Sequence, residues 1–223
     1  MPKLLNARDS QVLQNIADSM PELNQELQSL SSEAIVRWAA ERGEPMIAST
    51  SFGPNSAAML HLISQAAPDL PIIWVDSGYN MRDTYVVAEE IMERLKLNMK
   101  IYVPSVTSER LNVLMGGIPT LDEPEKHAEF TRIVKLDPFE KAIKDLAPKL
   151  WISGIRQTDT NFRRNLDVLS VDGRGIVKVA PIFRWTDEDL ANYMALHDLP
   201  SCRHYFDPTK VESGRECGLH TAA

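Results

Sequence analysis

The chain has 223 residues, of which 43% are hydrophobic and 25% are charged, and its formal net charge is -7. This length suits one sizeable α/β core, and no apolar run reaches the roughly 20 residues that a membrane helix needs. The acidic balance argues against a general nucleic-acid binder, and the N-terminus lacks the apolar stretch of a secretory signal. We therefore expect a cytoplasmic protein with no membrane and no nucleic-acid partner.

Helical and strand patterns then alternate along the chain. Residues 10–42 carry apolar side chains at helical spacing, and Pro21 is expected to separate two helices there. Short apolar runs predict strands over residues 46–50, 72–75, 100–103, 150–153 and 177–180. Amphipathic segments predict helices over about 56–67, 81–96, 136–147 and 186–197. This rhythm predicts an α/β fold with a doubly wound, mostly parallel sheet and helices on both faces.

The last part of the chain has a different composition. Residues 201–223 show no apolar period and contain Pro208, Gly214, Gly218 and many charged side chains. We interpret residues 1–200 as one α/β domain that includes the N-terminal helices. Residues 201–223 are interpreted as a flexible C-terminal arm.

The first candidate binding segment, residues 49–56, follows the first expected strand and precedes a helix. Hydroxyls, a glycine and a helix N-terminus in one place make a cradle for a phosphate. The Gly-Lys-Ser/Thr ending of a Walker A loop is missing. The alternative is that Asn55 or Ser56 only caps the helix. The candidate binding residues of this loop are Ser49, Ser51, Phe52, Gly53 and Ser56.

The second segment contains Asp76 and Gly78, directly after the second expected strand. The carboxyl ends of parallel strands share one edge of the sheet, where ligands of open α/β sheets bind. A carboxylate at that edge suits a ribose hydroxyl or an exocyclic amine. It suits equally well a role in ordering the turn.

The third segment, residues 154–164, follows the fourth expected strand at the same edge. Its arginines suit a sulfate or a phosphate, because the guanidinium fork matches pairs of anionic oxygens. The alternative is a solvated charged loop. The candidates are Gly154, Arg156, Arg163 and Arg164.

The fourth segment surrounds Cys217 in the tail. Cysteine attacks as its thiolate, and nearby cations lower the pKa of the thiol. Arg215 and His220 supply such charge, whereas Glu216 opposes it. The pattern leaves open a catalytic nucleophile or an inert thiol. Cys202 is left as a bystander thiol or as a disulfide partner of Cys217.

Together these segments resemble the phosphoadenylyl-sulfate reductase family, a branch of the adenine nucleotide α-hydrolase-like folds. The resemblance runs from about residue 46 to residue 220. Residues 216–220 are similar to the catalytic tail motif of the family, and residues 51–56, 76–79, 154–163 and 181–189 are similar to its other motifs. Two departures stand out: Asp159 replaces a common Gln, and Pro54-Asn55 is an uncommon filling of the phosphate loop.

The resemblance implies a thiol-dependent reductase of 3′-phosphoadenosine 5′-phosphosulfate (PAPS) in sulfate assimilation. The products are sulfite and adenosine 3′,5′-bisphosphate, formed through an S-sulfonate on Cys217. Thioredoxin or glutaredoxin is the implied reductant, and a homodimer is the implied assembly. The chain has two cysteines, too few to hold an iron–sulfur cluster. The resemblance therefore implies the cluster-free branch, with no bound cofactor and no metal.

The resemblance also implies roles for individual residues. Ser51, Gly53 and Ser56 are expected to hold the phosphosulfate. Arg156 and Arg163 are expected to neutralise its charge and that of the 3′-phosphate. In the catalytic motif, His220 beside Glu216 is expected to stabilise the thiolate or to donate a proton. The remaining expectations place Asp76 at the adenosine and Lys135 in a basic segment that contacts substrate.

Two other functions fit parts of the pattern. An ATP-dependent adenylating enzyme would use the phosphate loop but would give the tail cysteine no role. A non-catalytic adenine-nucleotide-binding protein would keep the pocket while its chemistry had changed. Formation of sulfite with thioredoxin separates the reductase from both alternatives.

Overall fold

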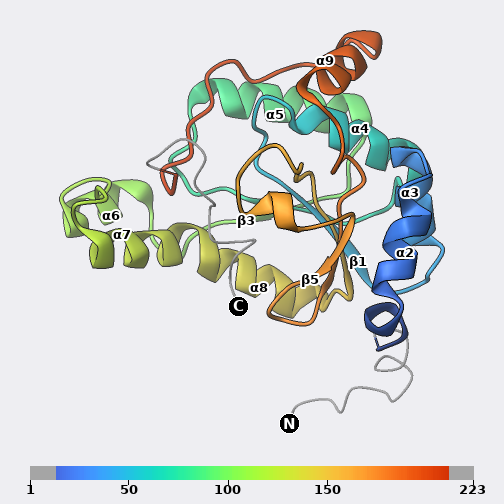
Figure 1. Cartoon of the computed structure of the whole chain (residues 1–223). Helices are drawn as coiled ribbons and strands as arrows, with labels where there is room; N and C mark the ends of the chain where they lie inside the picture. Colours follow the sequence, from blue (N-terminus) through green and yellow to red (C-terminus); the bar gives the residue numbers. More distant parts are fainter. Residues whose placement is uncertain (1–13, 211–223) are drawn as a thin grey trace.

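The fold, obtained as a computed structural model, is described for residues 14–210 and centres on one six-stranded sheet. The strand order is β3-β2-β1-β4-β6-β5 (Figure 1). All neighbours are parallel except β5 and β6. The strands are β1 (Met46–Thr50), β2 (Ile72–Val75), β3 (Met99–Tyr102), β4 (Leu150–Ile152), β5 (Leu169–Val171) and β6 (Val177–Val179). The predicted mostly parallel α/β fold is confirmed.

Helices cover both faces of this sheet (Figure 1). They are α2 (Met20–Leu27), α3 (Ser32–Ala40), α4 (Ser56–Ala66), α5 (Arg82–Leu95), α6 (Ser108–Met115), α7 (Pro124–Thr131), α8 (Asp137–Leu146) and α9 (Asp187–Leu196). Helices α2, α3, α4, α5 and α9 lie on one face, and α8 lies on the other. A π-helical turn, Arg132–Leu136, joins α7 to α8, and a 3-10 turn spans Arg163–Asn165.

The alternation of side chains along each strand creates two cores. Ala48 of β1 packs in the larger core, beneath α3 and α4, whereas its neighbour Ile47 faces α8. Ile72 and Ile73 of β2 divide in the same way. Successive strand side chains point to opposite faces, and both faces here are apolar. This explains why β2 and β4 are hydrophobic throughout, as strands of a parallel sheet buried on both sides are.

The predicted elements agree with the structure to within about one residue at each end. The N-terminal break falls at Ser19, and Pro21 lies in the first turn of α2 rather than between the helices. The sequence patterns missed the edge strand β5 and the helices α6 and α7. The last two project from the body of the molecule at the left of Figure 1.

Asn24 of α2 covers the outer edge of the sheet. Its side-chain amide donates to the Leu169 carbonyl at 3.1 Å and accepts from the Leu169 N–H at 2.7 Å. These bonds satisfy backbone groups that an edge strand otherwise leaves unpaired. The N-terminal helices therefore pack as part of the α/β domain.

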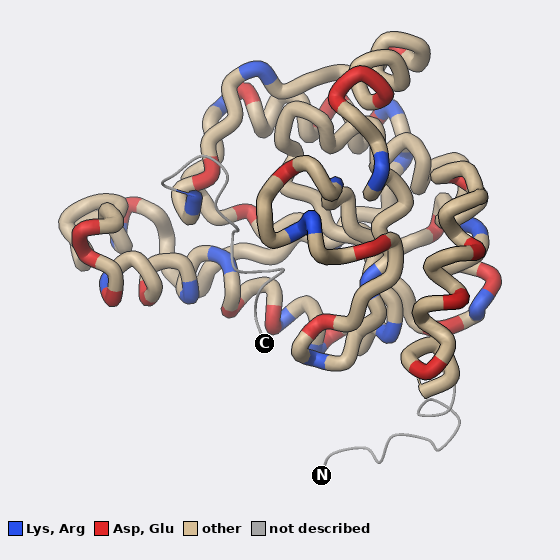
Figure 2. Tube along the Cα trace, in the orientation of Figure 1, with Lys and Arg blue, Asp and Glu red and all other residues tan. Residues whose placement is uncertain are grey.

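Charged residues of both signs are spread over most elements of the described chain (Figure 2). None of the helices in residues 14–210 is both long enough and apolar enough to span a bilayer.

Candidate active site

A cavity of about 290 Å³ opens at the carboxyl ends of β1, β2 and β4. Its wall is formed by the loop after β1, the loop after β4, the π-helical turn and residues 205–210. Of the residues predicted from the sequence, the structure brings eight together here: Ser49, Ser51, Gly53, Ser56, Lys135, Gly154, Arg156 and Arg163. The cavity thus unites segments that lie more than 100 residues apart in the chain.

The loop after β1 is held in a strained shape. Phe52 adopts φ 51°, in the left-handed region that costs a residue with a Cβ about 1 kcal/mol or more. Its side chain is fully buried and packs edge-to-face against Trp74, with 4.8 Å between ring centroids. Phe52 therefore anchors the loop in the core and leaves Ser51 and Gly53 at the cavity wall.

Helix α4 begins at this loop without a side-chain cap. Asn55 occupies the N-cap position, but its side chain makes no capping hydrogen bond. The capping role considered for Asn55 is therefore not what the structure shows. The N-terminus of a helix attracts anions through its N–H groups and its dipole. Asn55 and Ser56 both line the cavity, so that end of α4 is directed toward any anion bound there.

Trp151 of β4 fixes the hydroxyl of Ser49. Its indole N–H donates to Ser49 Oγ at 2.9 Å, and the side chain is fully buried. Phe139 packs at 5.0 Å between ring centroids, and the Lys178 ammonium lies 5.1 Å from the Trp151 ring centroid. A hydroxyl that already accepts a hydrogen bond keeps its own proton to donate. Ser49 is therefore prepared to donate to an anionic oxygen in the cavity.

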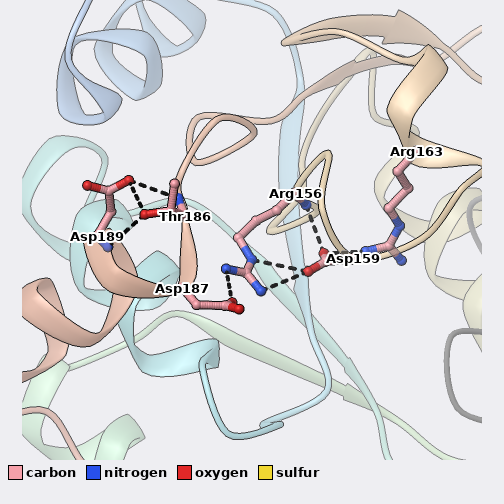
Figure 3. Close-up of polar contacts among 6 residues, drawn as sticks. All are labelled: Arg156, Asp159, Arg163, Thr186, Asp187 and Asp189. Atoms are coloured by element: carbon pink, nitrogen blue, oxygen red, sulfur yellow. Dashed lines mark hydrogen bonds and ion pairs between the residues drawn. The ribbon is translucent and has the colours of Figure 1, made fainter.

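The loop after β4 holds two arginines around one carboxylate (Figure 3). Asp159 lies 2.9 Å from Arg156 Nη2 and 2.7 Å from Arg163 Nη1, and it accepts the backbone N–H of Arg156 at 2.9 Å. Both arginine side chains are about nine-tenths buried. Arg156 and Arg163 are therefore not solvated surface charges, whereas the third arginine of the loop, Arg164, is exposed.

Helix α9 supplies a second carboxylate that contacts Arg156, that of Asp187. Thr186 and Asp189 form a capping box at its N-terminus, in which each side chain bonds the other residue's backbone N–H. This fixes Asp187 in the first turn, where it accepts from Arg156 Nη1 at 2.8 Å (Figure 3). The Asp187 side chain is 91% exposed, so water and salt screen its electrostatic attraction to Arg156.

Lys135 reaches the cavity from the π-helical turn. Its ammonium donates to Asp207 at 2.5 Å and to Thr209 Oγ1 at 3.1 Å. Burial disfavours ionisation of Asp207, but Lys135 and the hydrogen bonds from Thr209 outweigh it, so the pKa of this carboxyl lies below its usual value. An inserted π turn often marks a functional site. Here the π turn carries Lys135, whose ammonium group lies at the cavity wall.

Residues 201–210 form a strap across the cavity. Ser201 Oγ donates to the Pro54 carbonyl at 2.9 Å, and His204 pairs with Asp83 of α5 at 2.5 Å. Cys202 is a free thiol, fully buried, with its sulfur 3.5 Å from Thr84 Oγ1. Residues 201–210 therefore pack on the α/β domain, and the rest of the predicted arm lies outside the described residues.

Four predicted binding residues are not among the described residues that line the cavity: Phe52, Asp76, Gly78 and Arg164. Phe52 is in the core, Gly78 turns the chain at φ 76°, and Arg164 is exposed. Asp76 accepts from the Gly78 N–H, from Asn80 and from Tyr85. These hydrogen bonds order the turn after β2, which presents Ser77 and Asn80 to the cavity.

Tyr85 shows how firmly that turn is held. Its hydroxyl donates to Asp76 Oδ1 at 2.8 Å. Burial and this hydrogen bond raise the pKa of Tyr85 to about 12. The phenol therefore remains a donor throughout the neutral range, and Asp76 remains its acceptor.

The predicted catalytic residues Cys217, Glu216 and His220 lie outside the described residues. Sequence reasoning also missed contributors within residues 14–210. Tyr205, Asp207 and Thr209 reach the cavity from the strap, whose composition gave no structural signal. Trp151 was identified only as a strand residue, because its hydrogen bond to Ser49 arises from the pairing of β1 with β4.

The fold, together with a cavity lined by arginine and lysine side chains, places the chain among the adenine nucleotide α-hydrolase-like proteins. Two solved structures share this fold. One is a phosphoadenylyl-sulfate (PAPS) reductase from Candida auris in a phosphate complex, with TM-score 0.73, 22% identity, and 83% of this chain and 88% of that chain covered. The other is an FMN adenylyltransferase from Candida glabrata, with TM-score 0.56, 16% identity, and 87% and 63% covered.

Sequence comparison defines the family. The model of the phosphoadenosine phosphosulfate reductase domain matches residues 45–208. A phosphoadenosine 5′-phosphosulfate reductase from Synechococcus sp. is 36% identical over 183 residues, with 82% of this chain and 78% of the relative covered. Its counterpart from Xylella fastidiosa is 37% identical over 190 residues, with 82% and 77% covered. The chain belongs to the phosphoadenosine phosphosulfate reductase family, and it is an oxidoreductase.

Proposed function

We propose that the chain reduces PAPS to sulfite and adenosine 3′,5′-bisphosphate in sulfate assimilation, with Cys217 as the nucleophile. The observation that carries this proposal is the convergence of the phosphate loop, Arg156, Arg163 and Lys135 on one cavity. Each of these groups suits an anionic oxygen. An adenylating enzyme would use the same groups, but it would give the Cys217 motif no role.

The adenosine and the phosphosulfate of the substrate are assigned to different regions of the cavity. Apolar side chains from α4, α8 and α9, including Met59, Phe139 and Leu190, provide a surface for the adenosine. The phosphosulfate lies against the loop after β1, where Ser49, Ser51 and the start of α4 donate hydrogen bonds. Arg156, Arg163 and Lys135 neutralise the remaining negative charge, including that of the 3′-phosphate.

The chemistry proceeds in two transfers. The Cys217 thiolate attacks the sulfur of the sulfonyl group, an S–S bond forms, and the S–O bond to the nucleotide breaks. Adenosine 3′,5′-bisphosphate leaves with that electron pair, and Cys217 holds an S-sulfonate. A thiol of the reductant then attacks the Cys217 sulfur and releases sulfite. Its second thiol resolves the mixed disulfide, so the reductant is oxidised to a disulfide and Cys217 returns as a thiol.

The partners follow from this cycle. The reductant is a small dithiol protein, thioredoxin or glutaredoxin, which requires Cys217 to be accessible after the first transfer. Glu216 precedes Cys217 and His220 follows it by three residues. The charges of these two side chains shift the pKa of the Cys217 thiol in opposite directions. Residues 201–210, the part of the proposed arm that the structure describes, pack on the domain. We place the enzyme in the cytoplasm, as a homodimer without an iron–sulfur cluster.

An intact-mass experiment tests the first transfer directly. The reduced protein, mixed with PAPS and no reductant, should gain one sulfonate per chain, mapped to Cys217 by peptide analysis. A parallel sample with adenosine 5′-phosphosulfate measures nucleotide preference. Binding of either nucleotide without any adduct would contradict the proposal and would favour the non-catalytic or adenylating alternative.

A double-mutant cycle tests the contact between Trp151 and Ser49. Replacing Trp151 by Phe keeps a ring in the core but removes the N–H donor to Ser49 Oγ. We expect Trp151→Phe to weaken binding of adenosine 3′,5′-bisphosphate roughly fivefold, the value of one hydrogen bond of about 1 kcal/mol. In the Ser49→Ala background the same change should cost less than about twofold. Equal losses in both backgrounds would show that Trp151 acts only through packing.

A further inference from the structure

Asp159 is the carboxylate at the centre of the arginine loop. It touches Arg156 through Nε at 3.1 Å, Nη2 at 2.9 Å and the backbone N–H at 2.9 Å, and it touches Arg163 through Nη1 at 2.7 Å (Figure 3). The Asp159 side chain is 23% exposed. A charge so enclosed is screened much less than one at the surface, so its field reaches whatever binds in the cavity.

This carboxylate has two opposing effects on an anionic ligand. It holds the two guanidinium groups in place, which favours any anion that they contact. It also offsets one of the positive charges that line the cavity, which come from Lys135, Arg156, Arg163 and Lys210, with Asp207 already offsetting that of Lys135. The first effect is similar for every nucleotide. The second grows with the negative charge of the ligand, because Coulomb energy is proportional to that charge.

We propose that Asp159 sets how strongly the pocket distinguishes an adenylyl sulfate with a 3′-phosphate from one without it. The proposal rests on the proposed function, which places the anionic groups of the nucleotide against Arg156 and Arg163. Asp159 lowers the advantage of the more highly charged nucleotide. The structure thereby assigns a specificity-determining role to a residue that contacts the arginines rather than the reacting sulfur.

The test compares two nucleotides in three proteins. Asp159→Asn keeps the size of the side chain and one oxygen that accepts from the Arg156 N–H, but it removes the negative charge. We expect the ratio of kcat/KM for PAPS to kcat/KM for adenosine 5′-phosphosulfate to rise about tenfold. Asp187→Asn is the matched control, because Asp187 also pairs with Arg156 but is 91% exposed. That control should change the ratio less than about twofold.

Equilibrium binding separates this proposal from the proposed function. Adenosine 3′,5′-bisphosphate and adenosine 5′-monophosphate differ by the same 3′-phosphate and need no redox chemistry. Their affinity ratio should rise about tenfold in Asp159→Asn, and the rise should shrink in high salt. Absence of sulfite from the wild-type protein would sink the proposed function and leave this ratio measurable.

Two results would overturn the role of Asp159. An unchanged ratio in a folded Asp159→Asn protein would show that the charge does not reach the ligand. An equal loss of affinity for both nucleotides would show that Asp159 only aligns the arginines. Should the Asn variant unfold, Asp159→Gln provides the comparison, because it also keeps an acceptor oxygen without the charge; thermal unfolding is measured for each protein.

Discussion

Replacing Cys217 by Ser is expected to abolish sulfite formation while leaving nucleotide affinity within about twofold of the wild-type value. Serine keeps the size of the side chain, but its hydroxyl is far less ionised than a thiol at neutral pH and cannot form the S-sulfonate. The measurement is sulfite release with thioredoxin, paired with calorimetric binding of adenosine 3′,5′-bisphosphate. The intact-mass adduct should disappear in the same variant.

Cys202→Ser is the matched control for that experiment. Cys202 is fully buried and lies 3.5 Å from Thr84 Oγ1 and from the His204 carbonyl. We expect this variant to retain the adduct on Cys217 and most of the turnover. Sulfite production by Cys217→Ser at more than a trace level would refute Cys217 as the nucleophile.

Replacing Lys135 by Met is expected to impair both stability and binding. The change leaves the buried Asp207 carboxylate without its cation, and breaking such a pair costs about 3 kcal/mol in the free energy of unfolding. It also removes a cation from the cavity wall. We expect the affinity for adenosine 3′,5′-bisphosphate to fall roughly 100-fold, about 3 kcal/mol. Urea unfolding and calorimetry measure the two effects.

The double variant Lys135→Met with Asp207→Asn separates those effects. Removing both charges should restore most of the stability, because no buried charge is left unpaired. It should restore only part of the nucleotide affinity, because the negative charge of Asp207 is removed but the cation is still missing. Full recovery of affinity in the double variant would mean that Lys135 serves only to hold the strap.

The same ion pair makes part of the stability depend on pH. The pKa of Asp207 is lower in the folded state than its usual value, so the folded state favours the ionised carboxyl. The resulting stabilisation is fully present above the unfolded pKa of about 4. It is lost as the pH falls below that value and through the folded pKa. Asp207→Asn should therefore flatten the loss of stability in acid.

The parts of the site that could be predicted are those that follow strands. Residues 51–56 and 154–164 were identified because each comes directly after an apolar run, and parallel strands bring such segments to one edge. Lys135 was found by family resemblance alone, since a π turn has no hydrophobic period of its own. Sequence patterns therefore located two of the loops that line the cavity without indicating its third wall.

The unpredicted parts depend on contacts between distant residues. Asp207 pairs with Lys135, which lies 72 positions away in the sequence. Nothing in the composition of the strap indicates that pairing. The edge strand β5 has three residues, too few to show an alternating pattern, and Asn24 of α2 covers its edge. Asp76 ends a strand, which indicated a ligand-binding group; the structure adds that Gly78, Asn80 and Tyr85 all donate to its Oδ1, and its place at the adenosine stays a prediction.

The packed strap sets the length of the tether for the nucleophile. Cys217 follows Lys210 by seven residues, and a fully extended chain spans at most about 3.5 Å per residue. The thiol is therefore confined to within roughly 25 Å of a residue in the cavity wall, whatever path the chain takes. Such confinement corresponds to an effective concentration on the order of 10 mM. With Cys217 as the proposed nucleophile, delivery of the thiol to the nucleotide bound by the same chain would be an intramolecular step, independent of enzyme concentration, and lengthening the chain after Lys210 would dilute it.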